Sequence, residues 1–374
     1  MSGARRFDSV DALRGLTVAA MLLVNTPGDW GHVYAPLLHA PWHGCTPTDL
    51  VFPFFLFVVG VSIALGVAPR AEAGAATAAL HRAIAVRGLR IVALGLLLHL
   101  VAWWAFDTPH YRVWGVLQRI GLCFLVAAPL ALHLKPRTQW ALVAALLLGW
   151  WVLLAPAGYA PLHNLADRID TALFAPLLYR YDPGTGLGHD PEGLVSTLPA
   201  IATVLLGVRA GDWLRRGRPQ RLLGMGIAML VLGALWSLAM PFNKALWTSS
   251  YVLWTAGWAA LALWLLHLLI DRRGWPAVGR SFGVNAITAY AGSALMVCLL
   301  AASGQWGAVY GWAFAGWMTP RFGPYVPSLA FALCFVALWW GVVRWVQAAR
   351  SPRQYARGCD SFSRSLRASP KRRW

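Results

Sequence analysis

Long apolar runs recur along this 374-residue chain, and their length restricts it to one class of fold. A helix needs about 20 mostly apolar residues to cross the hydrocarbon core of a bilayer. Inside that core, a helix satisfies its own backbone hydrogen bonds. The sequence therefore predicts an all-α, polytopic transmembrane helix bundle of about ten spans, near residues 10–26, 49–68, 83–105, 113–134, 138–155, 193–210, 221–240, 247–270, 281–303 and 324–347.

The composition agrees with a membrane environment. Only 12% of the residues are charged, against about 25% in an average soluble domain. The net charge of +18 could indicate a nucleic-acid surface. However, the basic residues lie in short segments between apolar runs and in the C-terminal tail. We therefore expect membrane lipid as a partner, and no nucleic acid.

The basic residues also predict the orientation, because Lys and Arg concentrate on the cytoplasmic side of membrane proteins. They alternate between rich and poor connections, which indicates an even number of spans with both termini in the cytoplasm. We divide the chain into a transmembrane domain, 1–348, and a basic cytoplasmic tail, 349–374, expected to be disordered against anionic lipid. The rich connections contain Arg5 and Arg6; Arg70 and Arg82; Lys135 and Arg137; Arg215, Arg216, Arg218 and Arg221; Arg272, Arg273 and Arg280.

Two common features of exported proteins are not expected. Asp11 and Arg14 interrupt the first apolar stretch, which argues against a cleaved signal peptide. The five cysteines form no CxxC pair, so we expect neither a disulfide framework nor a structural metal site.

Eight of the 14 acidic residues lie in the predicted outer loops. These acids either keep the loops soluble or attract a cationic substrate.

Basic residues inside predicted spans are candidates for function, because they are costly in a bilayer. Arg14 follows Asp11 by three residues, which allows an intrahelical ion pair. Arg87 and Arg90 either extend to the cytoplasmic interface or bind phosphates, which guanidinium groups suit. Arg119 lies deeper, and we expect it to pair inside the bundle.

The loop after the first span carries the densest polar residues. Asn25 ends that span, and the following loop contains His32, His39 and His43 before a helix start that includes Asp49. A histidine beside a buried asparagine at the mouth of a bundle could act as a general base next to an oxyanion donor. The spacing alone leaves this role open.

Several longer motifs carry a resemblance to a known family. In chain order they are DALRGLTVAAMLLVNTPGDW, LHAPWHGCTPTDLVFPFFLFVVGVS, GVLQRIG, DPEGLVSTLPAIATVLLGVRAG, NKALWTSSYV and GVNAITAY. Together they resemble the heparan-α-glucosaminide N-acetyltransferase family and its bacterial relatives. The resemblance implies transfer of an acetyl group from cytosolic acetyl-CoA to the amine of a glucosamine on the far side of the membrane. It makes residues 1–348 a transmembrane acyltransferase domain.

The resemblance also implies site residues. The family's His-Ala-x-Trp-x-Gly motif places the active-site histidine at His39, and the catalytic asparagine falls on Asn25; His43 ranks second. Asp49 could hold the sugar, orient His39 or begin its helix. No metal is expected. The residues assigned to acetyl-CoA are Arg14, Arg87, Arg90, Arg119 and Asn285, and those assigned to the acceptor are Asp49, Trp42, His43, Asp190, Glu192 and Lys244.

Other readings remain open at this point. The chain lacks the extra lumenal domain of lysosomal members, so we expect a bacterial inner-membrane enzyme with a periplasmic amino sugar or glycan as acceptor. Transfer could be direct or pass through an acetyl-histidine. A homodimer is an open possibility. The rival functions are an amino-sugar transporter, which would not need the dense His39 loop, and a structural membrane protein, in which replacing His39 would change nothing.

Overall fold

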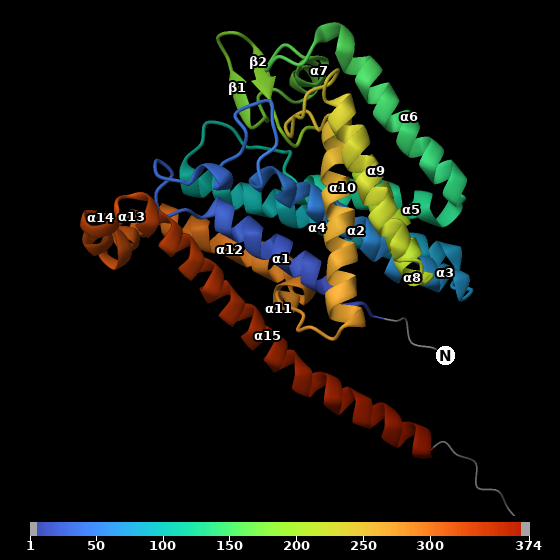
Figure 1. Ribbon diagram of the computed structural model, residues 1–374. Coiled ribbons are helices and arrows are strands. Elements are labelled where there is room, and N and C mark those ends of the chain that lie inside the picture. Colours follow the sequence, from blue (N-terminus) through green and yellow to red (C-terminus); the bar gives the residue numbers. More distant parts are fainter. Residues whose placement is uncertain (1–5, 368–374) are drawn as a thin grey trace, which may run out of the picture.

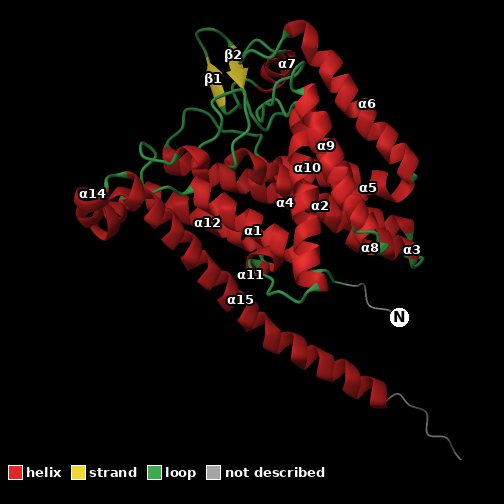
Figure 2. Ribbon diagram, viewed as in Figure 1, coloured by secondary structure: helices red, strands yellow, loops and turns green. Residues whose placement is uncertain are grey.

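The computed structural model describes residues 6–367, with side chains to residue 349. Helices dominate, and loops and a small β-hairpin gather at one end (Figure 2). The helices are α1 (Asp8–Asn25), α2 (Val51–Gly66), α3 (Ala68–Glu72), α4 (Thr77–Phe106), α5 (Val116–His133), α6 (Pro136–Leu154), α7 (Leu165–Phe174), α8 (Thr197–Arg215), α9 (Gln220–Trp236), α10 (Ser249–Leu266), α11 (Arg280–Val284), α12 (Ala286–Ala302), α13 (Gln305–Tyr310), α14 (Gly316–Phe322) and α15 (Tyr325–Arg367); the strands are β1 (Arg180–Asp182) and β2 (Leu187–His189).

Every predicted span coincides with a helix, which confirms the all-α membrane bundle. Six helical segments are long and apolar enough to cross a membrane, and a bent pair raises the number to seven. The other three predicted spans, α1, α8 and α9, are 18, 19 and 17 residues long, and the first two carry several charged residues. The number of spans, ten, and their orientation therefore stay predictions.

The bent pair lies where we expected a loop. Helix α12 is followed by a second helical segment, Gln305–Phe322, at an angle of 97°. This segment comprises α13, a π-helical turn and α14, and it projects from the bundle beside the start of α15 (Figure 1). Its sequence is apolar and continuous with α12, so a count of residues could not reveal the bend.

The start of α1 and the end of α15 lie on the same side of the bundle, opposite the hairpin (Figure 1). The backbone of α15 is helical to Arg367. The side chains beyond residue 349, and residues 1–5 and 368–374 altogether, lie outside the described part. The expected disorder of the tail at 349–374 stays a prediction, and Arg5 falls outside the description.

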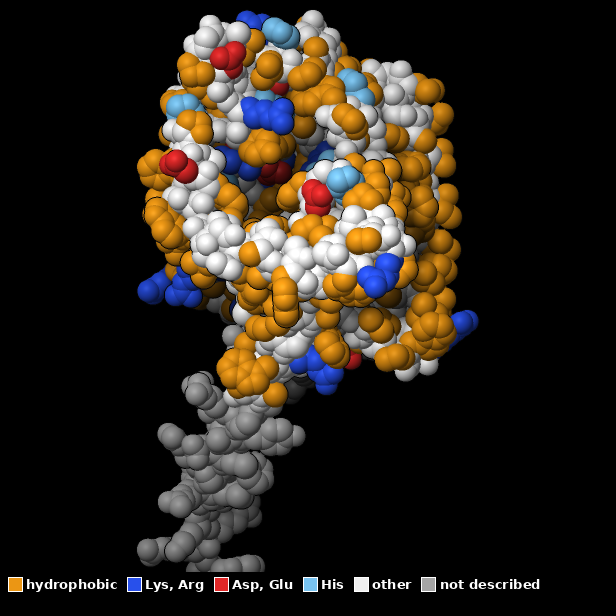
Figure 3. Space-filling model, turned by 90° about the vertical axis from the view of Figure 1, so that its left-hand side faces the viewer, with side chains coloured by type: hydrophobic (Ala, Val, Ile, Leu, Met, Phe, Trp, Pro, Cys, Tyr) orange, Lys and Arg blue, Asp and Glu red, His pale blue; other side chains and the backbone are white. Residues whose placement is uncertain are grey.

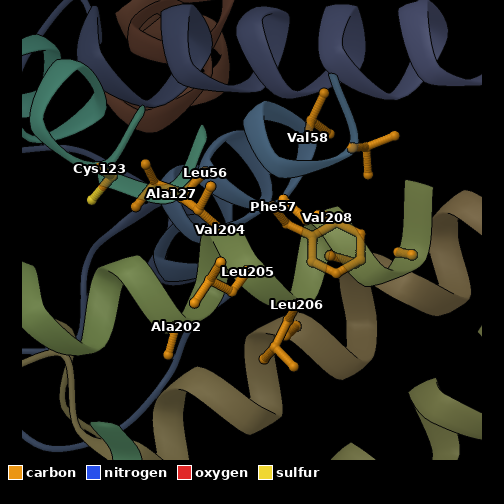
Figure 4. Close-up of a cluster of buried hydrophobic side chains, with 14 of the residues drawn as sticks. Leu56, Phe57, Val58, Cys123, Ala127, Ala202, Val204, Leu205, Leu206 and Val208 are labelled. Carbon is orange, nitrogen blue, oxygen red and sulfur yellow. The ribbon is translucent and has the colours of Figure 1, made fainter. Parts of the chain in front are cut away.

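Helices α2 and α8 form the centre of the bundle, and glycines allow them to touch. An added Cβ at Gly60 would lie 1.9 Å from the carbonyl oxygen of Val204, and one at Gly207 would lie 2.0 Å from that of Phe57. Leu56 and Phe57 of α2 and Leu205 of α8 belong to one buried cluster (Figure 4). The two backbones therefore approach each other as closely as small-residue interfaces in membranes allow.

At the hairpin end, loops from distant parts of the sequence form a cap. We use "outer cap" for residues 26–50, 107–115, 155–196 and 237–248. The Gly44 amide donates to the carbonyl of Phe242 at 2.8 Å, and the Trp42 indole donates to that of Tyr159 at 2.7 Å. The contacts of Gly44 and Trp42 join the loop after α1 to the rest of the cap. Helix α7 is capped by Asn164, whose side chain accepts from the Asp167 amide.

Candidate active site

His39 and Asp49 form the central pair of the outer cap. The Nδ1 of His39 lies 2.7 Å from Oδ1 of Asp49, whose side chain is 1% exposed while that of His39 is 48% exposed. A carboxylate only accepts hydrogen bonds, so this contact places the ring proton on Nδ1. The Nε2 atom of His39 is then the basic nitrogen, as a general base requires.

The hydrogen bonds of Asp49 bear on its three candidate roles. Its Oδ2 accepts from the Ala40 amide and from both the amide and the hydroxyl of Thr46, each at 3.0 Å. Both carboxylate oxygens therefore have donors within the protein. The geometry favours Asp49 as the residue that orients His39 and begins the helix, rather than as a sugar ligand.

The backbone conformation explains why the motif around His39 ends in a glycine. Gly44 has a φ of +124°, a region that favours glycine. This turn directs its amide to Phe242 and brings His43 beside Asn243, with 3.4 Å between Nδ1 and Nδ2. Burial lowers the pKa of His43. The Trp42 ring lies 5.3 Å from that of His189 and its indole donates to the Tyr159 carbonyl, so Trp42 anchors the loop.

Lys244 joins the pair from a segment 205 residues away. Its Nζ lies 3.2 Å from Nε2 and 3.3 Å from Nδ1 of His39. The hydrogen-bonding directions of the two ring nitrogens diverge within the plane of the imidazole. Nearly equal distances therefore indicate that Nζ is aligned with neither nitrogen. Burial lowers the pKa of the half-buried Lys244, while Glu192 and Asp49 oppose that shift. The assignment of Lys244 to the acceptor end agrees with this position.

The two acids assigned to the acceptor are held by an arginine that our sequence interpretation did not assign to the site. Arg112 donates to Asp190 at 2.6 and 2.9 Å and contacts Glu192 at 2.5 Å. Burial opposes the charge of Glu192, but Arg112, Lys244 and Arg119 together lower its pKa. The structure thus gives Asp190 and Glu192 a protein partner. The sequence did contain one indication that Arg112 belongs to the site, because arginine is rare in the predicted outer loops.

A cavity of about 450 Å³ lies between the helices. It is lined by three of the residues predicted to bind acetyl-CoA, Arg14, Arg87 and Asn285. Arg14 donates to Asp11 at 3.0 Å, to the Gly283 carbonyl at 3.2 Å and to the Ser62 hydroxyl at 2.8 Å. Ligand pockets typically measure about 300–1,000 Å³. Two guanidinium groups and apolar walls fit a phosphate-bearing ligand with a narrow arm.

The other two residues assigned to acetyl-CoA lie elsewhere. Arg90 lines an adjoining groove of about 780 Å³, which shares Arg87, Ile91 and Ile287 with the cavity. Arg119 is fully buried and does not line either space. It donates to the Gly193 carbonyl at 3.0 Å and to the Ser196 hydroxyl, and lies 5.2 Å from the Trp247 ring. Its Nη2 thus finds hydrogen-bond partners inside the bundle, whereas Nε and Nη1 have none among the described residues, and direct binding of acetyl-CoA in the cavity does not fit this position.

Asn25 lies between the cavity and the cap. It is exposed at the end of α1, four residues beyond Met21, which lines the cavity with Arg14. Residues four and seven apart share one helix face, so Arg14, Met21 and Asn25 lie along the same side of α1. Figure 3 shows a hollow in one face of the molecule, with basic, acidic and histidine side chains around it.

Comparison with known proteins identifies the family of this chain. The family model described as "Heparan-alpha-glucosaminide N-acetyltransferase, catalytic" matches residues 6–240. Heparan-alpha-glucosaminide N-acetyltransferase of Homo sapiens is 29% identical over 359 residues, which cover 77% of this chain and 52% of the human protein. The Mus musculus protein is 27% identical over 362 residues, covering 78% of this chain and 54% of its own length. The chain thus spans about half the length of the curated relatives it matches. It belongs to the heparan-alpha-glucosaminide N-acetyltransferase family, as its motifs predicted.

Proposed function

We propose that this protein is a transmembrane N-acetyltransferase, which moves an acetyl group from acetyl-CoA to the amine of a glucosamine-type sugar. The observation that carries the proposal is the combination of two features in a member of this family. The outer cap presents a His39–Asp49 pair, and the bundle beside it contains a cavity with Arg14 and Arg87. The first is suited to deprotonating an amine and the second to binding phosphates.

The cavity is the proposed donor end. Arg14 and Arg87 would bind the phosphates of the donor, and the apolar side chains of Phe55 and Val59 would surround its pantetheine arm. The excess of basic residues at one end of the predicted spans supports a cytoplasmic position for the phosphates. We infer a bacterial inner membrane, with the acceptor on the periplasmic side.

The outer cap is the proposed acceptor end. Nε2 of His39 would take a proton from the attacking amine, while Asp49 keeps the ring in the required tautomer. General-base catalysis contributes about 10²–10⁴-fold. The Asn25 amide would donate to the developing oxyanion, a contribution of roughly 3–4 kcal/mol. His43 and Lys244 would contact the sugar, whereas Asp190 and Glu192 act through Arg112.

The direct test uses purified protein in lipid nanodiscs with radiolabelled acetyl-CoA and a panel of amino sugars. We expect N-acetylated sugar from at least one glucosamine derivative. The variant His39→Ala should lower its rate by at least a hundredfold. Failure to acetylate any sugar, together with uptake of amino sugar into proteoliposomes, would establish the transporter instead.

A rapid-quench experiment separates direct transfer from an acetyl-histidine route. Acetyl-imidazole is labile to neutral hydroxylamine, whereas an amide is stable. If a covalent route operates, labelled protein forms within one turnover and hydroxylamine releases the label. If no hydroxylamine-labile label forms at a rate matching turnover, the transfer is direct.

A further inference from the structure

Lys244 places a primary amine beside the nitrogen that the acceptor amine has to approach. A general base must lie within about 2.6–3.2 Å of the atom whose proton it removes. Nζ of Lys244 lies 3.2 Å from Nε2 of His39, the basic nitrogen of the ring. An acceptor amine approaching the same nitrogen would have to share or displace this position. The protein itself thus supplies an amine at the reaction centre.

The segment that carries Lys244 is well anchored. Its neighbour Asn243 is fully buried, accepts from the Leu246 amide at 2.8 Å and donates its own amide to the Thr248 hydroxyl at 3.0 Å. The side chain of Lys244 is only half-buried. The backbone is thus held in place while the flexible end of the side chain remains able to move from His39 toward a bound donor.

The surroundings favour a reactive amine. Burial lowers the pKa of Lys244 and so increases its uncharged fraction. The charged neighbours act in both directions: Glu192 and Asp49 favour the ammonium form, and Arg112 and Arg119 disfavour it. A neutral amine beside a histidine base has the same chemistry as the proposed acceptor.

Lysine is also an unusual choice in this chain. Of its 32 basic residues, only Lys135, Lys244 and Lys371 are lysines. Lys135 is exposed at the start of α6, at the opposite end of the bundle from the cap in our orientation. An arginine at position 244 would provide charge but no nucleophilic amine at neutral pH, because its guanidinium stays protonated.

We propose that Lys244 is an internal acceptor, which lies beside the acceptor-amine position, turns toward Nε2 of His39 and becomes acetylated when a donor is bound without an amino sugar. This inference rests on the proposed acetyltransferase function. The Nζ lone pair attacks the thioester carbonyl, a C–N bond forms and the C–S bond breaks. His39 takes the proton from nitrogen and returns it to the departing thiolate. The products are Nε-acetyl-Lys244 and free CoA.

The test incubates the purified full-length protein with acetyl-CoA and no sugar, followed by peptide mapping by mass spectrometry after hydroxylamine treatment. We expect hydroxylamine-stable acetylation at Lys244 at least tenfold above that at Lys135. Glucosamine in excess should slow it. His39→Ala should reduce acetylation of Lys244 at least tenfold but leave the background at Lys135 unchanged. Lys135→Arg is the matched control and should leave modification of Lys244 unaltered.

The outcomes separate this inference from the function on which it rests. If the preparation acetylates glucosamine but modifies Lys244 no faster than Lys135, the internal-acceptor role is wrong and the enzyme function stands. Equal modification of Lys244 in the His39→Ala variant would also overturn it, since the acetylation would then be uncatalysed. If neither glucosamine nor Lys244 is acetylated, both proposals fail.

Discussion

At the scale of single residues, the chemistry of the outer cap depends on the contrast between two histidine–carboxylate pairs in one loop. His39 with Asp49 and His32 with Asp29 both have a 2.7 Å contact through Nδ1. Asp49 is buried, whereas Asp29 is 39% exposed. A buried carboxylate with several donors holds its partner in one orientation, while an exposed pair is weak. Of these two pairs, the His39 pair therefore has the better surroundings for a general base.

We therefore expect different results from matched substitutions. His39→Ala should lower kcat for sugar acetylation by about 10²–10⁴-fold, because the general base is lost. Asp49→Asn should also lower kcat, since an amide no longer specifies the Nδ1–H tautomer. The control His32→Ala should change kcat less than twofold. Equal losses for the two histidine variants, measured with radiolabelled acetyl-CoA, would contradict the assignment.

At the scale of elements, two contacts position the helices and the outer cap relative to one another. Helices α2 and α8 cross at Gly60 and Gly207, and helix α7 is attached to the start of α8 through Asp170. Asp170 accepts from the Val195 amide at 3.2 Å and is buried. The first contact sets the spacing within the bundle, and the second positions the outer cap on it.

Substitution at the helix crossing should be costly. Gly60→Ala places a Cβ 1.9 Å from the Val204 carbonyl, so the two backbones must separate. Overpacking of this kind costs about 1–3 kcal/mol or more. The control is Gly66→Ala in the same helix, where nothing lies within 4 Å. Thermal unfolding in detergent should show a lower Tm for Gly60→Ala, and an unchanged Tm would disprove the close crossing.

Asp170 should make stability depend on pH. Burial raises its pKa from 3.8 to about 6, helped by Asp190 and Asp167 and opposed by Arg119 and the Val195 amide. Between these values the folded protein retains a proton that the unfolded chain releases, so stability falls as pH rises through this window. Asp170→Asn removes the penalty, on the order of 1–3 kcal/mol. Its Tm advantage over the wild type should be larger at pH 7.5 than at pH 4. An equal advantage at both pH values would be inconsistent with the raised pKa.

At the scale of the whole molecule, the proposed reaction needs two ends with different chemistry. The cavity with Arg14 and Arg87 lies among the helices, and His39 lies in the cap beyond them. Asn25 lies on the face of α1 that joins the two regions. In the proposed reaction, this arrangement would let the acetyl group cross while the sugar and the nucleotide each stay on their own side.

The donor end can be tested through Arg87, which lines the cavity. Arg87 lies 5.1 Å over the Phe124 ring. A hydrogen bond to a charged group contributes about 1.5–3 kcal/mol, so Arg87→Gln should raise the KM for acetyl-CoA roughly 10–100-fold. The KM for the sugar should stay unchanged. Arg221→Gln, which replaces an arginine on α9 outside the cavity, is the control; a similar rise there would point to a general effect of charge.

The orientation can be tested by labelling from one side. Thr185 is exposed between β1 and β2, and Arg218 is exposed between α8 and α9. In a background without native cysteines, an impermeant maleimide added to spheroplasts should label Thr185→Cys but not Arg218→Cys. After lysis both should react. Labelling of Arg218→Cys from outside would reverse the proposed sidedness.

How much could be predicted from the sequence depended on the range of the interaction involved. The positions of the ten helices follow from apolar runs, because burial in lipid is a property of about 20 consecutive residues. The family followed from motifs such as His39–Gly44, which are also continuous. The right-angle turn after α12 did not, because both halves are apolar and the bend depends on packing against α15.

The sequence by itself determined the membrane class, the helices and the identities of His39 and Asn25 as candidates. Only the tertiary structure decided what their neighbours do. It brought Lys244 to His39 across 205 residues, paired Arg112 with Asp190 and Glu192, and turned Arg119 toward Gly193 instead of the cavity. Charged side chains are long and their partners are set by how helices pack, so pairings of this kind depend on the folded arrangement rather than on local sequence.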